Sequence, residues 1–184
     1  MKKGTTVASV RRKLAAGGLT VGVDLGDQES TVCVLDGAAE VIFEGVVKST
    51  RKGMMRWFRG VGASRVVMEA GTHSPWCSRL VEELGHEVVV TNPRQLRLIS
   101  GSVRKDDTTD AKTLAQVGRL DRELLRPVRH RGEQAQADLE LVKSRGLLVS
   151  ERTRGINHVR GAVKAYGERL PKCSAEAFPR RWRG

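Results

Sequence analysis

Short apolar runs and helical apolar periods alternate along residues 19–91, and their order predicts an architecture. Three valine-rich runs separated by short polar turns come first, and they predict strands at 19–24, 31–35 and 41–47. The second and third runs are joined through Asp36-Gly37, a pair typical of a β-hairpin. Three consecutive strands with such short connections predict an antiparallel meander.

The apolar period then changes to one typical of helices. Apolar side chains recur at i, i+3, i+4 and i+7 over 54–61, which predicts an amphipathic helix. A short strand at 65–68, a helix at 74–84 and a fifth strand at 87–91 follow. A meander followed by right-handed crossovers gives an α/β protein with a mixed five-stranded sheet and flanking helices, a ribonuclease H-like fold. The actin-like ATPase fold shares this order of elements, so the order alone leaves both folds open.

A different pattern covers the last third of the chain. From 134 to 166 apolar positions recur in steps of three and four, which predicts one long helix with an interrupted heptad seam. The seam favours pairing with a second helix, and hence a dimer or a larger homo-oligomer. We expect Arg145 and Arg152, on the other faces of this helix, to contact nucleic acid. The expected divisions are a loose basic arm, a sheet domain, the long helix and a basic tail, at 1–18, 19–130, 131–170 and 171–184.

The amino-acid composition indicates what kind of partner the protein binds. The 184 residues include 33 Lys and Arg against 21 Asp and Glu, for a net charge of +12 and a pI near 10.4. This excess favours a polyanionic partner, either nucleic acid or an anionic membrane surface. No run of about 18 apolar residues predicts a membrane span, and no apolar segment behind the first three residues predicts a signal peptide. Three widely separated cysteines indicate neither a disulfide framework nor a zinc site, so we expect a reducing, cytoplasmic compartment.

Four acids are the candidates for chemistry. Asp24 and Glu69 end two strands that should be neighbours in the sheet, and burying such an acid is costly unless a cation pairs with it. Asp107 and Asp110 are three residues apart, so they share one face of the predicted next helix, and Leu114 continues that face. Each acid also has an ordinary explanation as a turn, solvated or helix-capping residue. Their joint placement favours a single site.

Four carboxylates at one site would need cations. At about 4 Å and an effective dielectric of about 20, each pair repels by about 4 kcal/mol. Oxygen-rich sites suit Mg²⁺ or Mn²⁺, and two such ions about 3.5–4 Å apart support phosphodiester chemistry. The acids therefore predict a metal-dependent site acting on nucleic acid strands.

Basic residues close to these acids are candidate phosphate contacts. Arg94, Arg97, Arg104 and Lys105 flank the acids in the sequence, although solvated surface positions explain each one equally well. Trp57 and Trp76 fall at helical spacing, and we expect them in the core rather than on a base-stacking surface.

Four motifs within residues 20–120 resemble the DEDD transposases of insertion sequence family 110, close to the Piv-type invertases. The motifs are Val21-Gly22-Val23-Asp24, Val67-Met68-Glu69-Ala70-Gly71, Val90-Thr91-Asn92-Pro93 and Lys105-Asp106-Asp107-Thr108-Thr109-Asp110-Ala111. The resemblance implies a RuvC-like domain whose tetrad, Asp24, Glu69, Asp107 and Asp110, binds Mg²⁺ and acts on DNA. It also implies an element-encoded guide RNA and a place at the bacterial nucleoid.

The sequence departs from this family in its length. Members normally continue into a second domain that supplies a serine nucleophile, and this chain stops at Gly184. We therefore expect an N-terminal catalytic fragment or the product of a truncated element. Two alternatives stay open, a non-catalytic nucleic-acid-binding remnant and a RuvC-like junction nuclease. An actin-like ATPase or sugar kinase would need a second domain and fits the basic pI poorly.

Overall fold

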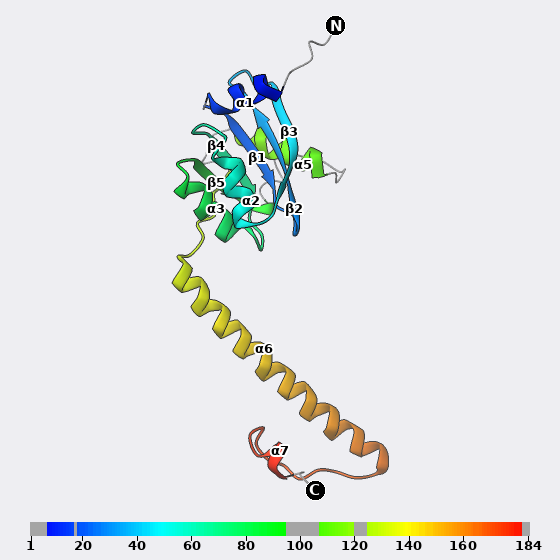
Figure 1. Ribbon diagram of the computed structural model, residues 1–184. Helices are drawn as coiled ribbons and strands as arrows, with labels where there is room; N and C mark the ends of the chain where they lie inside the picture. The colour runs from blue at the N-terminus through cyan, green and yellow to red at the C-terminus, as the bar shows by residue number, and fades with distance from the viewer. Residues whose placement is uncertain (1–6, 17, 95–106, 120–124, 182–184) are drawn as a thin grey trace. The chain divides into compact units, whose positions relative to one another are not determined.

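The computed structural model describes residues 7–16, 18–94, 107–119 and 125–181 of the chain (Figure 1). The side chains of residues 7–9, 107–109 and 181 lie outside the description. The chain divides into two compact units, Met1–His130 and Arg131–Gly184. The first unit contains the sheet, and the second contains the long helix.

Five strands form one mixed sheet in the order β3-β2-β1-β4-β5. β1 pairs antiparallel with β2 and β2 pairs antiparallel with β3, whereas the β1–β4 and β4–β5 pairs are parallel. The predicted meander, crossovers and ribonuclease H-like fold are therefore confirmed. The strands are Thr20–Asp24 (β1), Glu29–Leu35 (β2), Val41–Lys48 (β3), Arg65–Glu69 (β4) and Glu87–Thr91 (β5).

Helices cover both faces of this sheet, which explains why its central strands are apolar runs. The larger core cluster lies on one face, where Val21 and Val23 of β1 are fully buried with residues of three helices. These helices are α1 (Val7–Ala15), α2 (Arg51–Phe58) and α3 (Ser74–Glu83). Helix α5 (Asp107–Val117) packs on the other face, where Leu114 meets Val67 of β4.

The prediction of a loose arm over residues 1–18 is wrong for its second half. Val7–Ala15 forms α1, and Leu14 is only 7% exposed within the core. The Gly62 amide donates a hydrogen bond of 2.8 Å to the Leu14 carbonyl. Glycines and basic residues dominate this stretch, but Val10 and Leu14 are four apart and bury one stripe of an otherwise polar helix.

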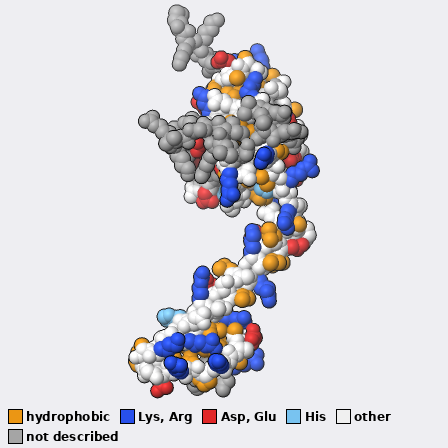
Figure 2. All heavy atoms as spheres, turned by 180° about the vertical axis from the view of Figure 1, so that it is seen from behind, with side chains coloured by type: hydrophobic (Ala, Val, Ile, Leu, Met, Phe, Trp, Pro, Cys, Tyr) orange, Lys and Arg blue, Asp and Glu red, His pale blue; other side chains and the backbone are white. Residues whose placement is uncertain are grey.

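The predicted long helix is confirmed. α6 spans Glu133–Ala162, and a 3₁₀ turn, η1 (Val163–Tyr166), extends it to the predicted end. Most of α6 is exposed, and Figure 2 shows apolar and basic side chains interspersed along it. Near its end Ile156 is buried, and the Arg160 guanidinium lies 5.5 Å from the ring of Phe178, the first residue of α7 (Phe178–Arg181). None of the described helices is both long and apolar enough to cross a membrane.

Candidate functional site

Two of the four predicted acids end adjacent parallel strands. The β1–β4 register pairs Val23 with Met68, so the next residues, Asp24 and Glu69, face each other across the strand pair. Parallel neighbours lie about 4.8 Å apart, and both residues are partly accessible at the edge where their strands end. Thr91 of β5 is the register partner of Glu69 at the same edge.

Both acids also belong to the strand positions that face α5. Side chains alternate between sheet faces, so Asp24 shares the face of Thr20 and Gly22, and Glu69 shares that of Val67. Val67 lies in the core cluster that contains residues of α5. The two carboxylates are therefore carried by the α5 side of the sheet.

Helix α5 approaches this face through small residues. A Cβ on Gly22 would lie under 3.0 Å from the Ala111 carbonyl oxygen and the Ala115 amide nitrogen. A Cβ on Gly118, one residue beyond α5, would crowd Val67 and lie 3.1 Å from Thr20 Cγ2. The helix backbone therefore rests directly on β1, which only glycine at position 22 permits.

These contacts also set the direction of α5. Ala111 lies beside Gly22 in the middle of β1, while Gly118 lies beside Thr20 at its beginning, so α5 runs antiparallel to β1. The four residues from Asp107 to Ala111 cover about 6 Å along the helix, and the two residues from Gly22 to Asp24 cover about 6.6 Å along the strand. The first turn of α5, which begins at Asp107, therefore lies toward the end of β1 that carries Asp24.

The backbone thus carries the four acid positions toward the same edge of the sheet. Asp110 is half-buried in the first turn of α5, and position 107 is one turn before the sheet-packed Ala111. The side chain of Asp107 lies outside the described part. Among the described side chains, no three His, Cys, Asp or Glu residues are grouped closely enough to hold a metal ion. This backbone arrangement fits a metal site with oxygen ligands. That all four carboxylates bind the metal stays a prediction.

The predicted nucleic-acid contacts divide between the two units. Arg94 is exposed just beyond β5, where its amide donates a 3.0 Å hydrogen bond to Asn92 Oδ1. Arg145 and Arg152 are exposed on α6, and Arg152 forms an ion pair of 3.5 Å with Glu176. Arg97, Arg104 and Lys105 lie outside the described residues.

A histidine that the sequence does not single out as a ligand links the loops behind the two strand-end acids. The Trp76 indole N–H donates to His73 Nδ1 at 3.2 Å, and His73 Nε2 lies 3.4 Å from Asp27 Oδ1. Since the indole can only donate, Nδ1 accepts and the ring proton is on Nε2, facing the carboxylate. Asp27 follows β1 and His73 follows β4, so this contact joins the two segments at the acid-bearing edge.

A second histidine, His130, contacts the β4–α3 loop through Ser74. The buried Ser74 hydroxyl donates to the Gly71 carbonyl at 2.8 Å, accepts from the Gly71 amide at 2.9 Å and lies 2.8 Å from His130 Nε2. Burial lowers the pKa of His130 below 6.5, and the nearby Arg79 lowers it further. Burial likewise lowers the pKa of His86, which packs against Phe58.

These histidines predict a loss of stability in mild acid. Because their folded pKa values lie below 6.5, the unfolded chain binds protons that the folded chain excludes, so stability is full above pH 6.5 and falls below it. We expect the free energy of unfolding, measured with urea, to decrease between pH 7.5 and 5.5. The variants His86→Gln and His130→Gln should flatten this dependence, while His158→Gln on exposed α6 should not. Equal pH profiles for all the proteins would contradict the assignment.

Comparison with known proteins identifies the family. The DEDD transposase model of the IS110 family, described as a transposase, matches residues 21–168. The chain belongs to the IS110 family of DEDD transposases. The match includes all four acids and the whole of α6, so the predicted resemblance is confirmed across both units.

A curated relative agrees with this family. Over 133 residues the chain is 31% identical to the putative transposase y4pF/y4sB of Sinorhizobium fredii, covering 71% of this chain and 34% of the relative. The chain therefore spans about a third of the length of that relative.

Two solved structures match part of this chain. T. thermophilus RuvC in complex with a Holliday junction substrate matches with a TM-score of 0.38 and 18% identity, over 53% of this chain and 90% of that one. The ethanolamine utilization protein EutJ from Carboxydothermus hydrogenoformans matches with a TM-score of 0.33 and 16% identity, over 52% of this chain and 50% of that one.

Proposed function

We propose that this chain is the acid-bearing domain of an IS110-type transposase, in which Asp24, Glu69, Asp107 and Asp110 bind Mg²⁺ or Mn²⁺ and act on DNA strands. One observation supports this proposal above all: the ends of β1 and β4 and the first turn of α5 lie at the same edge of the sheet. The family match extends over the same elements.

The proposed roles follow from where each acid is held. Asp24 and Glu69 are fixed by adjacent parallel strands, so their backbones form the rigid side of the site. Asp107 and Asp110 come from a helix whose docking on Gly22 sets their height above the sheet. A divalent ion bound there would polarise a phosphodiester and lower the pKa of an attacking hydroxyl. Carboxylates from three separate elements would hold it only when α5 is docked.

The direct test is a calorimetric titration of the chain with Mn²⁺, comparing wild type with Glu69→Gln and Asp110→Asn. Each substitution removes one anionic ligand at nearly constant volume, so we expect metal affinity to fall at least about tenfold. Glu40→Gln is the matched control, since Glu40 is exposed in the β2–β3 turn at the opposite end of β1. Unchanged Mn²⁺ affinity in both site variants, with the fold intact, would remove the metal site.

The partners proposed for the whole transposase are DNA, a guide RNA encoded by the element and a second copy of the chain. The net charge of +12 supports a nucleic acid partner. Apolar side chains that are 61–71% exposed on α6 support pairing through this helix: Leu141, Val142, Leu147 and Leu148. We place this activity at the nucleoid, in the bacterial cytoplasm.

A non-catalytic nucleic-acid-binding role is the second candidate for this chain. The chain spans 34% of the length of its curated relative. This candidate predicts salt-sensitive binding of nucleic acid that does not change in the Glu69→Gln and Asp110→Asn variants or on addition of Mn²⁺. A RuvC-like junction nuclease would instead cleave four-way junctions in a metal-dependent manner.

A further inference from the structure

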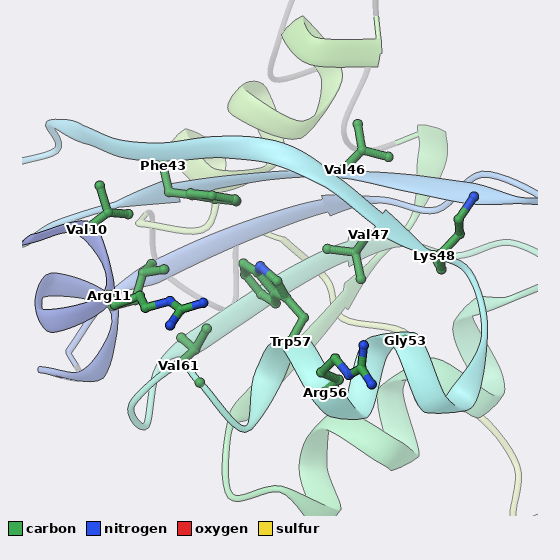
Figure 3. A pocket seen from close by; sticks show the side chains of 12 residues that line it. Val10, Arg11, Phe43, Val46, Val47, Lys48, Gly53, Arg56, Trp57 and Val61 are labelled. Atoms are coloured by element: carbon green, nitrogen blue, oxygen red, sulfur yellow. The ribbon is translucent and has the colours of Figure 1, made fainter. Parts of the chain in front are cut away.

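A groove lies on the face of the sheet opposite α5. It is bounded by α1, the edge strand β3 and α2, and its volume is about 890 Å³ (Figure 3). Such a volume is large enough for a flat organic group with its substituents. The acid-bearing edge does not contribute to the lining, so the groove is a separate feature of the first unit.

An indole lies at the centre of this groove. Figure 3 shows Trp57 between β3 and the segment that follows α2. Phe58 packs edge-on against its ring at a centroid distance of 4.8 Å, and Phe43 lies at 6.0 Å with an interplanar angle of 42°. Phe43 in turn lies over Gly45, where a Cβ would be 2.7 Å from its ring. The aromatic surface is therefore held in place while part of the indole lines the groove.

The charged residues that line the groove are all cationic. They are Arg11 of α1, Lys48 of β3 and Arg56 of α2. Lys48 is paired with Glu29 at 2.6 Å. Arg11 and Arg56 form no ion pair within the described part of the chain, and Figure 3 shows the Arg11 side chain extending toward Trp57. The groove therefore contains an aromatic surface that is held in place and two guanidinium groups without an ion-pair partner in the described part of the chain.

We propose that this groove binds a single-stranded segment of nucleic acid, with an unpaired base stacked on Trp57 and adjacent phosphates paired with Arg11 and Arg56. Base–aromatic stacking tolerates any base, and guanidinium groups suit phosphate oxygens. A base within a duplex is already stacked on both sides and cannot enter. The occupant is therefore unpaired RNA or DNA, and this binding is independent of the metal site at the opposite face.

The test measures binding of fluorescein-labelled 12-mers of oligo-U and oligo-dT, and of a 12-base-pair duplex, to the full chain by anisotropy in EDTA. The double variant Arg11→Gln/Arg56→Gln should lose at least about tenfold in affinity for the single strands. Its salt-dependence slope should fall by about 1.4, since each phosphate contact contributes about 0.7 on single strands. The oligomer that binds with the higher affinity shows whether the groove prefers RNA or DNA.

Arg12→Gln/Arg59→Gln is the matched control, because both arginines are exposed and do not line the groove. Arg12 lies in α1 and Arg59 directly follows α2. It removes the same charge and should change single-strand affinity less than about threefold. Trp57→Leu should cost about tenfold while Trp57→Phe keeps most of the affinity, with folding checked by circular dichroism. Trp76→Phe on α3 is the aromatic control.

Three results would overturn the proposal. The first is an equal loss of single-strand affinity in the double variants Arg11→Gln/Arg56→Gln and Arg12→Gln/Arg59→Gln, which would mean that net charge alone accounts for the binding. The second is single-strand affinity that does not change in folded Trp57→Leu. The third is displacement of the oligomer by poly-glutamate as efficiently as by unlabelled oligomer, which would make the groove a site for acidic peptides. Because no metal is present, none of these results depends on the acids of the proposed site.

Discussion

Replacing Asp24 by Asn in an intact transposase with the same four acids is expected to lower strand exchange at least about a hundredfold. Asp24 ends β1 on the face that α5 covers, beside Glu69 of β4, so it is the acid held between the other strand and the helix. The substitution keeps size and removes the charge. A plasmid recombination assay measures the effect, and gel-shift binding of DNA measures whether the partner is retained.

The control for this variant is Glu40→Gln, which removes an acid from the exposed β2–β3 turn. Recombination should stay within about twofold of wild type, since exposed substitutions away from a site have small effects. Normal recombination by Asp24→Asn would remove the strand-end acids from the chemistry. Loss of DNA binding together with recombination would mean that the variant disturbs the partner surface rather than a metal site.

Gly22→Ala is expected to lower the free energy of unfolding by about 3 kcal/mol. The added methyl group would meet backbone atoms of Ala111 and Ala115, which cannot move aside as a flexible side chain can. Relief requires α5 to move away from β1, and this carries the first turn of the helix away from Asp24. Urea unfolding measures the loss of stability, and Mn²⁺ titration of the folded variant measures the effect on the site.

Gly37→Ala is the matched control, because a Cβ at this turn position meets nothing within 4 Å. Its stability and metal affinity should remain close to those of wild type. If Gly22→Ala were as stable as Gly37→Ala, the close approach of α5 to β1 would be disproved. If it were destabilised but bound Mn²⁺ with unchanged affinity, the acids of α5 would not belong to the metal site.

The sequence by itself determined the order and type of the elements. Valine-rich runs bounded by polar turns mark β1 to β5. The runs are nearly continuous in β1, β4 and β5, because a strand buried on both faces needs apolar side chains on both. The acids at the ends of β1 and β4 are visible for the same reason, since they interrupt apolar runs. The spacing of Asp107 and Asp110 predicted a shared helix face, and the family motifs implied that both belong with Asp24 and Glu69. The match to residues 21–168 confirmed the family.

The contacts between elements were decided only by the tertiary structure. The sequence shows a glycine at position 22 and small residues at 111 and 115, but nothing local says that they touch. Likewise, the sequence predicts a basic arm where the structure has α1, with Leu14 in the core. It also predicts that Trp57 is a core residue, whereas the structure places this side chain in the lining of a groove. Close packing depends on partners far apart in the chain, whereas apolar periodicity is written into each segment. The pattern therefore predicts what each element is, and only the folded chain decides which carboxylates and cations meet.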